Sequence, residues 1–309
     1  MFLSLLIKGF IVGISFTIPG CSGGTFSVYV GIYDELLHAL GNLFKEFKKS
    51  MTFLIPVGLG LAIGILLFSK LMALALQANS FITIMVFIGL TIGGVPNLFQ
   101  KIKGNKVTAS GIVSFIVAFA IVIVMVIFQV LSGANNIDHL EMNALNILLL
   151  FALGFICAIT MIIPGVSGSA LLLILGFYTA IVSNVVGNLL NFGNFGYNLF
   201  ILIPFALGAV AGVLSVSKIL ETTLRKFPVQ SYLGIIGFIL SSAAILLLWI
   251  RDPETADAFV EQEPIYLNLG GYLAAHGWSV VIGIVGLGVG LFGSTQIVKL
   301  GLKGKNGVR

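Results

Sequence analysis

The feature that most restricts this chain is the length of its segments without charge. The clearest runs from Val107 to Leu131, and about 20 apolar residues suffice for a helix to cross the hydrocarbon of a bilayer. Only 9% of the 309 residues are charged and 58% are hydrophobic, whereas a soluble domain carries about 25% charged residues. So little charge cannot give the chain a surface compatible with water. The sequence therefore predicts an all-α integral membrane protein.

The two halves of the chain resemble each other. Residues 9–33 (GFIVGISFTIPGCSGGTFSVYVGIY) align without a gap with residues 154–178 (GFICAITMIIPGVSGSALLLILGFY), and eleven pairs are identical. After a three-residue insertion, residues 53–72 align with 201–220, which matches Lys70 with Lys218. Chance similarity among apolar helices does not easily match proline, glycine, serine and lysine in the same order. We expect two membrane repeats, 1–144 and 145–309.

Each repeat begins with an apolar segment that is broken by Pro-Gly-x-Ser-Gly. Proline removes a backbone donor, and the following glycines adopt geometries that a helix excludes. We expect a half-helix over 3–18, an unwound loop over 19–24 and a second half-helix over 25–42, with the loop buried or lining a cavity. Full spans are then expected at 53–76, 80–100, 107–131, 199–222, 229–250 and 278–298.

Basic residues predict the orientation in the membrane. If each broken segment enters and leaves on one side, twelve basic residues share a face, and the loops 132–144 and 251–277 hold only Arg251 among basic residues. The positive-inside rule then places both termini in the cytoplasm. This gives about six transmembrane helices plus two re-entrant hairpins, although two full crossings per broken segment would give the same sides. With three crossings per repeat, the second repeat has inverted topology, as in secondary transporters.

The loops PGCSGGT (19–25) and PGVSGSA (164–170) have the composition of an anion site. Each begins a half-helix, where free N–H groups and the positive end of the helix dipole point outward. Turns that only allow close helix packing are the alternative, but paired copies in an inverted repeat favour a ligand site. The predicted phosphate-binding residues are Ser22, Gly23, Gly24, Thr25, Ser167, Gly168 and Ser169. The predicted loop-shaping residues are Pro19, Gly20, Pro164 and Gly165.

Ionisable residues inside predicted spans are further candidates. Lys70 is expected roughly 25 Å along its span, near the outer face, at 1.5 Å per residue. Lys218 is expected near the inner end of its own span, so each lysine could capture a headgroup at one mouth of the site. Snorkelling to lipid headgroups is an equal alternative, and Lys218 could also pair with Glu221. Asp34 and Glu35 are candidates for proton or sodium coupling, although solvated interfacial residues are the favoured interpretation.

Other residues give weaker signals. Residues 36–47 have apolar side chains at helical spacing beside lysines, which indicates an amphipathic helix on the cytoplasmic interface or a continuation of the hairpin arm. His38, His139 and His276 are scattered, and we assign them no role beyond interfacial or satisfied residues. The sequence contains no Walker lysine motif, no HExxH and no paired cysteine cluster. We expect no cofactor, no metal site and no nucleic-acid partner.

The motifs IPGCSGGT (18–25) and IPGVSGSA (163–170), with SK pairs at 69–70 and 217–218, resemble those of the bacterial polyprenyl-phosphate transporters. The resemblance covers essentially the whole chain. It implies a flippase of the bacterial cytoplasmic membrane that returns undecaprenyl phosphate from the outer to the inner leaflet for cell-envelope synthesis. It also implies phosphate binding by the loop residues above. Ser169 and Ala170 replace the Gly-Thr of the first copy, so the second loop offers a poorer hydroxyl pattern.

Two other functions use the same loops. A secondary transporter of a small soluble anion would differ in having no opening toward lipid. A polyprenyl-phosphate phosphatase would need a nucleophile or base near the phosphate, and no histidine lies near either loop in sequence. We therefore expect a transporter rather than an enzyme.

Overall fold

The computed structural model describes residues 2–18, 22–131, 137, 139–166, 168, 171–172, 175–177, 180–181, 195–251 and 264–306. Within this part of the chain, regular structure is helical apart from one isolated β-bridge between Arg251 and Pro264. The prediction of a helical chain is confirmed for these residues.

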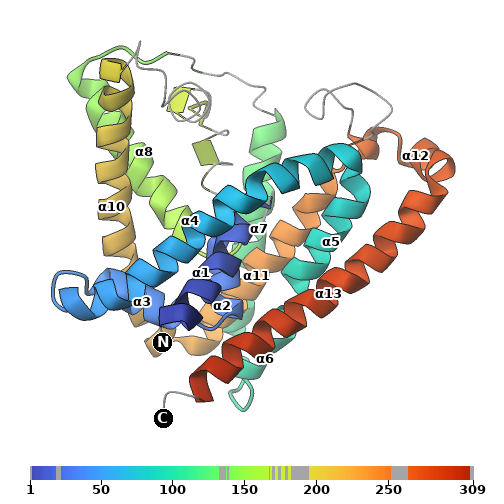
Figure 1. The fold of residues 1–309 in the computed structure, drawn as a ribbon, viewed down its shortest axis with the longest axis horizontal. Helices are drawn as coiled ribbons and strands as arrows, with labels where there is room; N and C mark the ends of the chain where they lie inside the picture. Colours follow the sequence, from blue (N-terminus) through green and yellow to red (C-terminus); the bar gives the residue numbers. More distant parts are fainter. Residues whose placement is uncertain are drawn as a thin grey trace.

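Twelve α-helices and two short 3-10 helices are described (Figure 1). They are α1 (Phe2–Thr17), α2 (Gly23–Tyr29), α3 (Tyr33–Gly41), α4 (Phe47–Ala78), α5 (Ser80–Ile92), α6 (Val95–Lys101), α7 (Ala109–Leu131), α8 (Ala144–Ile162), α10 (Phe195–Lys226), α11 (Pro228–Leu246), η3 (Leu247–Trp249), η4 (Ile265–Leu267), α12 (Leu269–Ala275) and α13 (Gly277–Asn306).

Seven of the described helical segments are long and apolar enough to cross a membrane. They include all six predicted spans, with α5 and α6 counted together. The seventh is α8, the first arm of the second broken segment, whereas α1 at 16 residues is shorter. The chain is therefore a multi-pass membrane protein by the length and composition of its helices.

The long helices pack in four pairs: α1 with α4, α8 with α10, α5 with α13, and α7 with α11 (Figure 1). Glycines allow the close approach within these pairs. A Cβ atom on Gly60 would overlap the carbonyl oxygen of Leu6, and one on Gly208 would overlap the carbonyl oxygen of Phe151. The sequence alignment matches Gly60 with Gly208 and Leu6 with Phe151, so the two matched glycines make matched contacts.

The second half-helix expected over 25–42 is wrong as a single element. It consists of α2 and α3, which are separated by Gly31 at φ 71°. Only glycine adopts this left-handed conformation at little cost, and Gly301 of α13 lies against the carbonyls of Tyr29 and Val30. The predicted amphipathic helix over 36–47 is also wrong in extent, because α3 ends at Gly41 and α4 begins at Phe47.

The span expected over 80–100 is also divided, into α5 and α6. The two helices meet at Gly93 and Gly94, and Pro96 occupies the first turn of α6. A proline there cannot donate the hydrogen bond that would continue α5. A side chain at Gly94 would overlap the ring of Tyr29, so the bend makes room for α2.

The helices α2 and α3 reach the centre of the protein. Every residue of α2 is buried, and Tyr29, Tyr33 and Leu37 belong to one apolar core with Ile162 and Ile236. Both chain termini, α3 and α6 lie at one end of the molecule, and α12 lies at the opposite end (Figure 1).

Candidate functional site

The first loop ends at Ser22, which caps α2. The Ser22 backbone is extended (φ −108°, ψ 136°), and its Oγ accepts a hydrogen bond from Gly24 N at 3.2 Å. The same hydroxyl donates to the carbonyl oxygen of Ile163 at 3.4 Å. Serine is a preferred N-cap because its side chain satisfies an N–H that has no partner within the helix. The Ser22 hydroxyl therefore both caps the start of α2 and contacts the start of the second loop.

The two predicted loops meet at Gly24. A Cβ atom there would lie 2.9 Å from the carbonyl oxygen of Ile162 and 3.1 Å from Cα of Pro164. Tyr33 donates to the same Ile162 carbonyl at 3.2 Å. The loops, 141 residues apart at the Ser22–Ile163 contact, are thus brought together in the core, and we call this contact the loop crossing.

The second loop is held by its glycine. Gly165 has φ 86°, and a Cβ atom on it would lie 2.6 Å from the carbonyl carbon of Phe238. Pro164 and Gly165 are buried, and the carbonyl of Gly168 lies 3.8 Å from Cys157 Sγ. The predicted residues Pro19, Gly20, Ser167 and Ser169, together with Cys21 and Ala170, fall outside the described residues.

The N–H groups in the first turn of α2 are not free, whereas the sequence predicts free N–H groups for an anion site. The N–H of Gly24 is bonded to Ser22 Oγ, and those of Thr25 and Phe26 point to the Ser22 carbonyl oxygen at 3.0 and 3.4 Å. The helix has seven residues, so its dipole is weaker than that of the longer half-helix expected from sequence. The N–H groups of Gly24, Thr25 and Phe26 are therefore engaged at the loop crossing, and an anion would have to compete with Ser22 for them.

The two predicted lysines lie apart from the loop crossing. Lys70 of α4 and Lys218 of α10 are both exposed. The backbone of Lys218 lies against α3, since a Cβ atom on Gly41 would be 3.0 Å from Lys218 Cα. Among the described residues, the ion-pair partners of Glu221 are His38 and Arg225 rather than Lys218.

A polar group that the sequence analysis missed joins α3 to α10, and we call it the His38 cluster. It consists of His38, Asn42, Glu46, Lys49, Glu221 and Arg225. His38 Nδ1 lies 2.8 Å from Glu221 Oε1, and His38 Nε2 lies 3.4 Å from Glu46 Oε2. Arg225 pairs with Glu221 at 2.9 Å and Lys49 with Glu46 at 2.8 Å. Hydrogen bonds from Lys49 and then His38 lower the pKa of Glu46 below its ordinary value.

Two cavities flank this cluster. One of about 360 Å³ is lined by Glu221, Arg225 and Tyr232, and one of about 560 Å³ by His38, Glu46 and other residues. Asp34 lines both cavities, and Glu35 lines the larger. Both of these carboxylates are exposed, in keeping with solvated residues at an interface.

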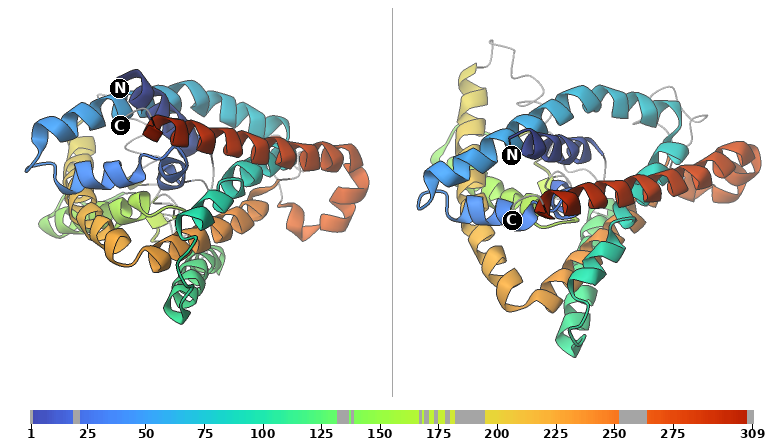
Figure 2. Two further views of the ribbon diagram at one scale, coloured as in Figure 1. Left: turned by 90° about the horizontal axis from the view of Figure 1, so that it is seen from below. Right: turned by 60° about the horizontal axis from the view of Figure 1, so that its bottom comes forward.

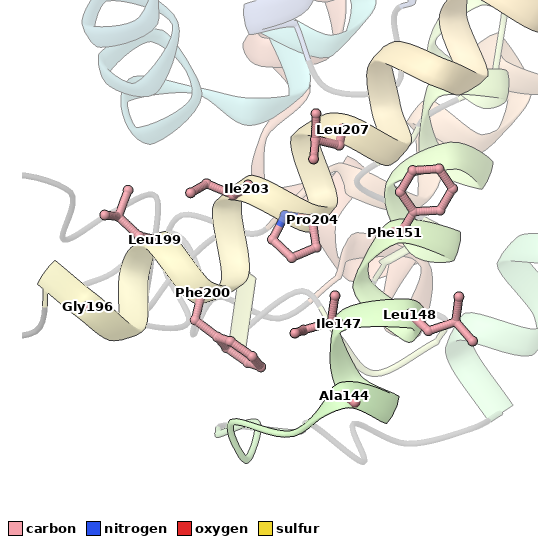
Figure 3. A pocket seen from close by; sticks show the side chains of 10 residues that line it. All are labelled: Ala144, Ile147, Leu148, Phe151, Gly196, Leu199, Phe200, Ile203, Pro204 and Leu207. Atoms are coloured by element: carbon pink, nitrogen blue, oxygen red, sulfur yellow. The ribbon is translucent and has the colours of Figure 1, made fainter.

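An apolar groove of about 550 Å³ lies between α8 and α10 (Figure 3). No polar side chain contributes to its lining, which consists of Ala144, Ile147, Leu148, Phe151, Gly196, Leu199, Phe200, Ile203, Pro204 and Leu207. The groove begins at the start of α8, and the other end of α8 is Ile162 at the loop crossing. Its lining on α8 ends at Phe151, so the groove follows the first half of the helix that leads to the second loop.

The apolar helices define a helical, multi-pass membrane protein, and the two predicted loop regions meet in its core. The chain belongs to the undecaprenyl phosphate translocase-like family, whose sequence profile matches residues 12–262. This confirms the resemblance found in the sequence motifs.

Two relatives carry the name polyprenyl-phosphate transporter. The protein from Staphylococcus aureus (strain NCTC 8325 / PS 47) is 33% identical over 242 residues, which cover 77% of this chain and 83% of the relative. The protein from Vibrio cholerae serotype O1 (strain ATCC 39315 / El Tor Inaba N16961) is 29% identical over 264 residues, covering 80% and 78%. No solved structure matches the chain.

Proposed function

We propose that this protein is a lipid-carrier translocase of the bacterial cytoplasmic membrane. It moves undecaprenyl phosphate from the outer to the inner leaflet, for reuse in cell-envelope synthesis. The family and the names of the two relatives support the substrate class. The observation that carries the proposal within the molecule is the loop crossing, where Ser22 contacts the carbonyl of Ile163.

The proposed membrane topology has two inverted repeats with re-entrant first segments. Matched glycine contacts support the repeats, since Gly9 packs on Val57 and Gly154 packs on Phe205, as the alignment pairs them. The positions of the termini, α3 and α6 at one end of the molecule support a common side for the basic segments (Figure 1). The positive-inside rule makes that side the cytoplasm.

In the proposed mechanism, the phosphate headgroup enters between the loops. The polyprenyl tail stays in apolar surroundings throughout. The headgroup takes over the donors that Ser22 and the first turn of α2 now use within the loop crossing. The groove between α8 and α10 offers an apolar surface for the polyprenyl tail along the first half of α8, as far as Phe151. The proposed cycle breaks no bond, because the lipid keeps its phosphate and only changes leaflet.

The test of this proposal is transport of undecaprenyl phosphate by the purified protein in vesicles. Lys70→Gln should reduce uptake from the outer leaflet about tenfold at low lipid concentration, because an anion is attracted to a cation before it binds. Lys218→Gln should slow transport at all concentrations, since Lys218 is proposed to act at release. Lys103→Gln is the matched control, because Lys103 lies in an exposed turn. Lys70→Arg should keep part of the activity, because it retains the positive charge.

Normal transport by both glutamine variants would remove the lysines from the mechanism and favour snorkelling. Uptake of inorganic phosphate with no movement of lipid would instead replace the proposed function with that of a soluble-anion transporter.

The topology makes a separate prediction. In a protein without Cys21 and Cys157, single cysteines from Asn105→Cys and Thr255→Cys should be labelled from opposite sides of the membrane. Position 105 lies in the exposed turn before α7, and position 255 falls outside the described residues. Intact cells treated with an impermeant maleimide should label only the cysteine at 255. Labelling of both positions from outside would contradict the six-crossing arrangement.

A further inference from the structure

The His38 cluster connects the two halves of the chain at the end where the termini lie. His38 belongs to α3 of the first half, and Glu221 belongs to α10 of the second, 183 residues further on. Asn42, the residue that follows α3, donates to Glu221 Oε2 at 3.3 Å, so both oxygens of this carboxylate contact side chains of α3 or its C-cap. Figure 2 shows α3 beside the C-terminal part of α10 in the view from below.

This contact differs from the other long-range contacts of the fold. The four helix pairs are joined by glycines whose missing side chains let backbones touch, as at Gly60 and Gly208. Between α3 and α10, charged side chains add to the glycine contact at Gly41 and to the buried Leu37, with 33% of His38 and 14% of Glu221 exposed. Two cavities lie on either side of it. The charged groups of this contact line the two cavities, so water can replace their partners when they separate, whereas buried backbone contacts at the glycines have no such replacement.

The same helix also touches the loop crossing. Tyr33, the first residue of α3, donates to the carbonyl of Ile162, and the next carbonyl, of Ile163, accepts from Ser22. The helix α3 has nine residues and therefore spans about 14 Å at 1.5 Å per residue. A displacement of α3 from α10 would thus be transmitted along one short rigid element to the point where the loops meet.

We infer that His38 and Glu221 form a latch between the two halves, which is closed in this structure and must open when the loops part to pass the headgroup. The inference rests on the proposed function, because the opening step belongs to the transport cycle. His38 and Glu221 are positioning residues, since neither lies at the loop crossing. The charged groups around them are Glu46 and Lys49 from the start of α4, Asp34 and Glu35 from α3, and Arg225 from α10.

A metal bridge would hold the latch closed. Asn42 Nδ2 lies 3.2 Å from His38 Nδ1 and 3.3 Å from Glu221 Oε2, so the three side chains converge on one point. In the variant Asn42→His/Glu221→His, three imidazoles from two halves can bind Zn²⁺, which takes histidine nitrogens at about 2.0–2.1 Å. The carboxylate of Glu221 could itself bind Zn²⁺ together with two imidazoles, so the matched control is Asn42→His/Glu221→Gln. This control keeps both imidazoles of the first half and has no carboxylate or imidazole at position 221 of α10. We call the variant with three imidazoles the double variant.

The double variant should bind Zn²⁺ more tightly than the control, as measured by titration of the purified protein without lipid. At a Zn²⁺ concentration of about ten times the dissociation constant, transport of undecaprenyl phosphate should fall about tenfold, because the closed state is stabilised by that factor. A chelator should restore it. Zn²⁺ should leave transport by the control unchanged.

Two results would overturn the latch. Equal zinc affinity in both variants would mean that α3 and α10 do not meet at these residues. Tighter binding in the double variant without inhibition would mean that the contact stays closed throughout transport, while the proposed function would stand. Failure of the unsubstituted protein to move lipid would refute the proposed function instead, and the zinc titration would still report whether the bridge exists.

Discussion

Gly24→Ala should strongly reduce lipid transport, while the protein still inserts in the membrane. The added methyl group would lie 2.9 Å from the Ile162 carbonyl oxygen and 3.1 Å from Pro164 Cα, and neither backbone atom can turn away. Overpacking of this kind costs about 1–3 kcal/mol, which corresponds to roughly a 5–150-fold change in an equilibrium. Transport in vesicles, normalised to the amount of inserted protein, is the measurement.

The neighbouring glycine provides the control for this prediction. At Gly23 an added methyl group meets the ring of Phe16, which is 38% exposed and can rotate away. Gly23→Ala should therefore keep most of the transport activity. If both variants lost activity equally, the loss would result from replacing either glycine of this turn. The contact between Gly24 and the second loop would then have no special importance.

Gly60→Val should destabilise the whole protein. Its Cβ atom would overlap the carbonyl oxygen of Leu6 in the α1–α4 pair, and a branched side chain would separate the two backbones. We expect the free energy of unfolding to fall by about 2 kcal/mol, within the range of about 1–3 kcal/mol that is typical of overpacking. It should appear as a lower unfolding temperature in detergent and a lower yield of folded protein.

Gly58→Val is the matched control, because it lies in the same helix and nothing lies within 4 Å of its added Cβ atom. The two substitutions have equal effects on helix propensity, so the difference between them reports the helix contact alone. Equal unfolding temperatures for the two variants would contradict the close packing of α1 on α4.

The sequence predicted the spans and the two loops for physical reasons. Uncharged segments identify spans because a bilayer excludes charge, and a repeated proline-glycine break identifies two loops of one kind. The break at Gly31 was missed although the alignment carries a signal, since Gly31 matches Gly176 and both have positive φ. The residues on both sides of Gly31 hide that signal, because they fit a continuous helix equally well.

The His38 cluster could not be predicted from the sequence. His38 and Glu221 occupy unmatched positions in the alignment, and no local spacing relates them. Their contact depends on the path of α3 after the turn at Gly31, which the prediction of one continuous half-helix had placed elsewhere. Likewise, sequence alone gives Gly23 and Gly24 the same role, and only their neighbours, Phe16 and Ile162, separate them.

The pairing of helices across the halves has a consequence for biosynthesis. Two helices of the first half, α5 and α7, find their partners in α13 and α11 of the second half, which are synthesised after them. The packing faces of α5 and α7 must therefore wait in the bilayer, without these partners, until α13 and α11 have been inserted. Assembly of this protein is a late event, and a nascent chain that stops before α13 leaves α5 exposed to lipid or to quality control.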